Sequence, residues 1–128
     1  MSQQRTKLAI LLLAATPERP ELCASAFVHA AAAAALDCEV EIHFSGAASR
    51  LLVAGEAARR SVAANDGKSL YLFMREAANL GVHFVGCAMA LNEHIRKGEA
   101  YIPEYSGSAS VTDFVLRTLD PEWATLVF

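Results

Sequence analysis

The segment Gly81-Val82-His83-Phe84-Val85-Gly86-Cys87-Ala88-Met89-Ala90-Leu91 carries the strongest local signal in the sequence. Residues 82–85 have the apolar character of a short buried strand that ends at Gly86. Gly86 lacks a β-carbon, so the chain can turn sharply there and other groups can approach it closely. Residues 88–91 are good helix formers. The segment therefore predicts a strand followed at once by a helix, with Cys87 at the junction.

Two interpretations of Cys87 are open from its position alone. The free backbone N–H groups and the positive dipole at a helix start favour a thiolate over a thiol. The carboxyl end of a strand is also where open α/β sheets usually hold their ligands. Against this, most free cysteines are small buried hydrophobes without a chemical role.

The alternation of strand and helix continues in both directions from this segment. Apolar or alternating runs predict strands at residues 7–14, 39–44, 82–85, 102–106 and 124–128. Helical spacing and end signals predict helices at residues 20–36, 69–80, 87–96 and 110–119. Such alternation is typical of a parallel α/β sheet. We expect one domain spanning residues 1–128, because the chain is too short for two.

Composition narrows the classes of function. Hydrophobic residues make up 54% of the chain and charged residues 20%, which suggests that part of the surface is buried against other subunits. The net charge of -3 gives no reason to expect nucleic-acid or membrane-surface binding. No apolar run reaches the length of a membrane span. Three cysteines without paired spacing fit a reducing cytoplasm better than a disulfide framework.

The histidines give no clear catalytic partner for Cys87. His94 follows it by two helical turns, about 10 Å, which is too far for a direct hydrogen bond, so we expect His94 to face solvent. His43 and His83 lie within strands, where packing in the core or an interface is the default. Cysteines and histidines lack the spacing of a zinc site, so no metal is expected.

Several other residues have a chemical and a structural interpretation. Cys23 lies in the first turn of its helix, where the dipole lowers a thiol pKa, but a partly exposed helix residue without a chemical role is the favoured interpretation. Cys38, at the entry to a strand, is expected to be structural. Arg50 and Arg59 either surround the carboxyl end of the sheet and hold an anion or form a solvated face. Gly46 follows the second strand in a loop that lacks the lysine and further glycines of a phosphate-binding fingerprint.

The order of segments resembles the DsrE/DsrF-like family, which includes the TusD and YchN-like proteins. The likeness covers nearly the whole chain, with an apolar first strand, a proline-marked turn into a long helix, and His43-Phe44-Ser45-Gly46-Ala47 followed by Leu51-Leu52. Its most telling part is residues 81–89, similar to the family's glycine-apolar strand ending in a cysteine. The closing helix and strand, residues 113–128, are also similar. The resemblance implies a flavodoxin-like three-layer sandwich with a mostly parallel five-stranded sheet.

The same resemblance implies sulfur relay. In active members the matching cysteine, here Cys87, carries a persulfide that is accepted from one protein and passed to another. We therefore expect a cytoplasmic homotrimer or homohexamer with sulfurtransferase activity, sulfur donor and acceptor proteins as partners, and no cofactor. Candidates that shape the substrate or anion site are Gly86, Ala88, Met89, Gly46, Arg50 and Arg59. The alternative is a non-catalytic small-ligand-binding or assembly subunit in which Cys87 is buried and inert.

Overall fold

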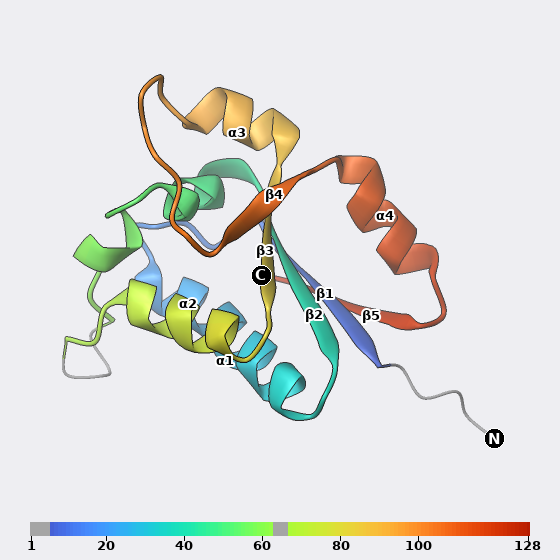
Figure 1. Ribbon diagram of the computed structural model, residues 1–128. Helices are drawn as coiled ribbons and strands as arrows, with labels where there is room; N and C mark the ends of the chain where they lie inside the picture. Colours follow the sequence, from blue (N-terminus) through green and yellow to red (C-terminus); the bar gives the residue numbers. More distant parts are fainter. Residues whose placement is uncertain (1–5, 63–66) are drawn as a thin grey trace.

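A five-stranded parallel sheet forms the centre of the computed structural model, which describes residues 6–62 and 67–128 (Figure 1). The strands are β1 (Lys7–Leu12), β2 (Glu39–Phe44), β3 (His83–Cys87), β4 (Tyr105–Ala109) and β5 (Trp123–Val127). They lie in the order β4-β3-β2-β1-β5, and every neighbouring pair is parallel. The predicted parallel α/β sheet is thus confirmed.

Helices cover both faces of the sheet and complete a three-layer α/β sandwich of the flavodoxin-like kind. They are α1 (Pro20–Ala35), α2 (Leu70–Asn79), α3 (Ala88–His94) and α4 (Val111–Leu119), with short 3-10 helices η1 (Gly46–Leu52) and η2 (Ala57–Arg59). The chain adds β2, β3 and β4 in one direction and then returns past β1 to β5. Because parallel crossovers are right-handed, this reversal places α4 on the face opposite α1 and α2 (Figure 1).

The two faces of the sheet differ in how much core they contain. On the α1 and α2 face, alternate strand residues such as Ile10, Ile42 and Phe84 are fully buried in the main hydrophobic cluster. On the α4 face, the buried cluster formed by the described residues consists of Ala9, Phe114 and Trp123, with Leu11 packed against it. The short helix α4 therefore covers this second face incompletely. A cavity lies beside it at the carboxyl ends of the strands.

Helix end signals were predicted well. Ser69 caps α2, since its side chain accepts a hydrogen bond from the Leu72 N–H at 3.3 Å. Gly81 follows that helix with φ of +98°, a left-handed conformation that favours glycine. None of the helices in residues 6–62 and 67–128 is long and apolar enough to cross a membrane.

Several strand boundaries differ from the prediction: β1 ends at Leu12 rather than at residue 14, and the difference is largest at β4. The strand expected at residues 102–106 begins at Tyr105, because the preceding segment pairs elsewhere: Ile102 donates its N–H to the Leu52 carbonyl and Tyr101 bridges to Val53. The strand expected to end at Gly86 continues to Cys87. Gly86 instead allows close packing, because a β-carbon there would lie 2.8 Å from Cδ1 of Leu91 in α3.

Candidate functional site

A cavity of about 200 Å³ lies on the α4 face, where β1, β2 and β3 end. It is lined by Leu11, Leu13, His43, Ser45, Cys87, Ser110, Val111 and Phe114. The first five come from the carboxyl ends of the three strands or the residues just beyond, and the last three from the start of α4. This is the edge at which open α/β sheets hold ligands. The volume suits a ligand smaller than a typical drug-sized molecule.

Cys87 is the last residue of β3 and the residue that precedes α3. Its thiol is free and half-buried, and the residue lines the cavity. Strand alternation explains the direction of its side chain: Gly86 faces the main core and Cys87 faces α4. The cysteine predicted at the strand–helix junction is therefore open to a small ligand.

His43 is a titratable residue that lines the cavity together with Cys87. It is 4% exposed, and its Nε2 lies 2.8 Å from Oε1 of Glu41. Phe114 of α4 meets the imidazole edge-on, with ring centroids 5.2 Å apart. Packing within a strand was the expectation for this histidine, and the structure adds that the buried ring also borders the cavity.

Glu41 and Arg117 form the support of His43. Nε of Arg117, in α4, donates to the same Glu41 oxygen at 2.8 Å. Burial alone would raise the pKa of Glu41, but hydrogen bonds from His43 and Arg117 outweigh it and bring the pKa to about 2. The Arg117 guanidinium in turn lies 4.2 Å from the ring centroid of Trp123. The carboxylate is therefore ionised at neutral pH and fixed from both sides.

Sheet register brings His43 and Cys87 close together. His43 pairs with Val85, and Cys87 lies two residues further along β3 on the same face. With a rise of roughly 3.3 Å per residue and strands about 4.8 Å apart, their Cα atoms are about 8 Å apart. That spacing leaves room for a substrate atom or one water between the two side chains.

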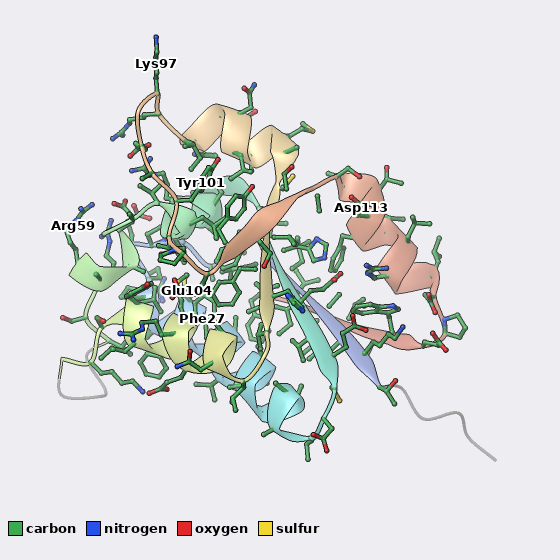
Figure 2. The ribbon with its side chains drawn as sticks, viewed as in Figure 1. Phe27, Arg59, Lys97, Tyr101, Glu104 and Asp113 are labelled. Atoms are coloured by element: carbon green, nitrogen blue, oxygen red, sulfur yellow. The ribbon has the colours of Figure 1, made fainter. Side chains whose placement is uncertain are left out.

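The structure does not bring Arg50 or Arg59 to Cys87. Arg50 donates to both Glu99 oxygens, at 2.5 and 2.9 Å, and to the His94 carbonyl. Arg59 is paired with Glu56. Both arginines and His94 line a different, polar hollow, and Figure 2 shows Arg59 on the opposite side of the molecule from α4. The sequence could not reveal this, because Glu99 lies 49 residues from Arg50.

The other residues proposed to shape an anion site also lie outside the cavity lining. Gly86 packs under Leu91, and Met89 is 67% exposed. Ala88 borders a separate shallow hollow beside β4. Gly46 is next to Ser45, a lining residue, but does not line the cavity itself. α3, which begins directly after Cys87, has seven residues.

The other cysteines are structural. The expectation that Cys23 is partly exposed is wrong: the residue is fully buried, and its thiol donates to the Thr16 carbonyl at 3.3 Å. Burial raises its pKa to about 12, so the helix dipole does not activate it as one interpretation proposed. Cys38 packs against the main core. Among the described residues, no group of three or more histidine, cysteine or acidic side chains is arranged to hold a metal ion.

Comparison with known proteins does not identify a family. No model of a known protein family matches the sequence, and no curated protein is significantly similar to it. The relation to the DsrE/DsrF-like family is therefore a proposal.

Proposed function

We propose that this protein is a sulfur-relay protein that accepts sulfane sulfur on Cys87 as a persulfide and passes it on. The observation that carries the proposal is the free Cys87 thiol in a cavity of about 200 Å³ at the carboxyl ends of the strands. The other two cysteines are packed in or against the core, which leaves Cys87 as the candidate carrier. The likeness of residues 81–89 to the cysteine motif of the DsrE/DsrF-like family supports the same activity.

The transfer step requires no external oxidant. Sγ of Cys87 attacks the outer sulfur of a donor persulfide, R–S–SH, and a new S–S bond forms. The S–S bond of the donor breaks, and its inner sulfur leaves and takes up a proton as R–SH. The second transfer repeats this exchange, with an acceptor thiol attacking the outer sulfur held on Cys87.

The lining of the cavity favours a donor with little charge at its reacting end. Four lining residues, Leu11, Leu13, Val111 and Phe114, are apolar, and no lysine or arginine among the described residues lines the cavity. A dianion would lose hydration there without gaining a cationic partner. A persulfide therefore suits the site better than thiosulfate.

The wider biological setting follows from the same proposal. We place the protein in the cytoplasm as a homo-oligomer that meets donor and acceptor proteins at the cavity mouth. The exposed apolar residues of α4 support an assembly surface. The same small apolar cavity also supports the alternative, a ligand-binding or assembly subunit without transfer activity.

Intact mass spectrometry separates the two functions. The protein is incubated with cysteine persulfide or with thiosulfate, alongside Cys87→Ser and the matched control Cys38→Ser. Sulfur relay predicts a gain of one sulfur from the persulfide that is reversed by reductant, absent in Cys87→Ser and retained in Cys38→Ser. If no Cys87-dependent gain occurs while the protein stays folded, the binding-subunit function is the better account.

A further inference from the structure

The hydrogen bonds of His43 define which ring nitrogen carries its proton. The Glu41 carboxylate has a pKa of about 2, so at neutral pH it can only accept a hydrogen bond. Nε2 of His43, 2.8 Å away, must therefore be the donor. In the neutral imidazole this leaves Nδ1 without a proton and with a free lone pair.

Nδ1 of His43 opens onto the cavity. No described residue forms a hydrogen bond with it, yet no buried side-chain nitrogen or oxygen among the described residues is sealed off without a partner. Nδ1 must therefore reach solvent, although only 6% of the side chain is exposed. Since His43 lines the cavity, this small exposed part faces the space that Cys87 also borders.

We infer that His43 is the proton acceptor for the Cys87 thiol, an inference that rests on the proposed sulfur transfer at this site. As Sγ attacks the outer sulfur of the donor, Nδ1 takes the thiol proton, directly or through one water. The imidazolium then returns this proton to the departing thiolate. The balance is Cys87–SH plus R–S–SH giving Cys87–S–SH plus R–SH.

Glu41 and Arg117 act as positioning residues for this step. Glu41 accepts the hydrogen bond from Nε2–H, and its negative charge stabilises the imidazolium. The carboxylate has the same role in other nucleophile–histidine–acid sets. Arg117 fixes the carboxylate from α4. Besides Glu41 and Arg117, the titratable residues near His43 in the described part of the chain are Asp113 on α4 and Cys87 on β3. On the other side, β1 presents the apolar Leu11.

The test is the single-turnover rate of sulfur loading from cysteine persulfide across pH, in wild type, His43→Gln and the control His94→Gln. The glutamine amide can still donate to Glu41, which preserves the fold, but it has no lone pair equivalent to Nδ1. We expect His43→Gln to load about 10²-fold more slowly at neutral pH. Its rate should keep rising with pH after that of wild type has levelled off, with the final occupancy of Cys87 unchanged. His94→Gln should behave as wild type.

The rate at which iodoacetamide alkylates Cys87 is a second measurement of thiol activation, and it needs no sulfur donor. The inference predicts slower alkylation in His43→Gln at neutral pH and recovery at high pH, followed on the Cys87 peptide. Wild-type rates and pH profiles for His43→Gln in both assays would overturn it. A wild-type protein that takes up no sulfur would contradict the sulfur-relay function. If its alkylation still depends on His43, the assignment of His43 as proton acceptor is nevertheless supported.

Discussion

Glu41 is the ionised partner of both His43, which lines the cavity, and Arg117. Its folded pKa of about 2 lies below the roughly 4.3 of an unfolded glutamate. The ionised carboxylate therefore stabilises the fold above about pH 5, and this contribution is lost as the pH falls toward 2. A difference of a little over two pKa units corresponds to about 3 kcal/mol.

We accordingly predict that Glu41→Gln lowers the free energy of unfolding by about 3 kcal/mol at pH 7, and that the difference from wild type narrows as the pH approaches 2. Urea denaturation at a series of pH values measures both effects. Glu39→Gln is the matched control, because Glu39 is exposed and its contact with Lys7 is 3.8 Å long. A loss in Glu41→Gln that does not vary with pH would contradict the charge argument.

Gly86 tests the packing beneath the cysteine. A β-carbon at residue 86 would lie 2.8 to 3.0 Å from three atoms of the Leu91 side chain. We predict that Gly86→Ala costs about 1–3 kcal/mol through overpacking. In a double-mutant cycle of urea denaturation, Leu91→Ala should relieve much of that cost. Strict additivity of the two substitutions would show that Leu91 is not the neighbour that matters.

At the scale of elements, Arg50 joins η1 to the segment between α3 and β4. It reaches Glu99 and the His94 carbonyl, and its side chain is only 15% exposed. We predict that Arg50→Met lowers the free energy of unfolding, because Glu99 and the His94 carbonyl both lose their hydrogen-bond donor. Cys87 alkylation should keep the wild-type rate, because Arg50 lies in a different hollow.

The control for Arg50→Met is Arg19→Met, which removes an exposed ion pair with Glu21 and should change the free energy of unfolding much less than Arg50→Met does. Urea denaturation and iodoacetamide labelling supply the two readouts. A large fall in the Cys87 labelling rate of folded Arg50→Met would mean that this arginine does influence the thiol.

At the scale of the whole molecule, the outer surface of α4 is unusually apolar. Val115, Leu116 and Leu119 are exposed, Leu119 at 75%. We predict that the protein is an oligomer assembled through this helix, and that Leu116→Glu with Leu119→Glu dissociates it. Light scattering after size-exclusion chromatography gives the mass. Leu36→Glu, at an equally exposed site beyond α1, should leave the oligomer intact. A monomeric wild type, or a double variant of unchanged mass, would contradict the assignment.

The fold could be predicted from sequence to a large extent because its signals are local. Apolar or alternating runs mark β1, β2, β3 and β5, and Ser69 and Gly81 mark the ends of α2. The position of Cys87 at a strand–helix junction follows from the same kind of pattern. Such features depend on residues a few positions apart, which a single sequence displays directly.

The cavity could be predicted only in part because it depends on which strands are neighbours. His43 lies near Cys87 because β2 is paired with β3 in the observed register. Nothing within either strand specifies that pairing. Arg50 was misplaced for a similar reason, since a long side chain points toward its tertiary partner. His43 could have been identified from the alternation of side chains along β2, had the order of strands in the sheet been known.

The most direct test of sulfur relay is to locate the transferred sulfur by peptide mass mapping of wild-type protein loaded with cysteine persulfide. Each cysteine lies in a different structural setting: Cys23 is sealed in the core, Cys38 packs against it, and Cys87 borders the cavity. We predict that the additional sulfur is found on the Cys87 peptide, and that an acceptor thiol releases it from the loaded protein. Sulfur found on Cys38, or on no cysteine of the folded protein, would contradict the assignment of Cys87 as the carrier.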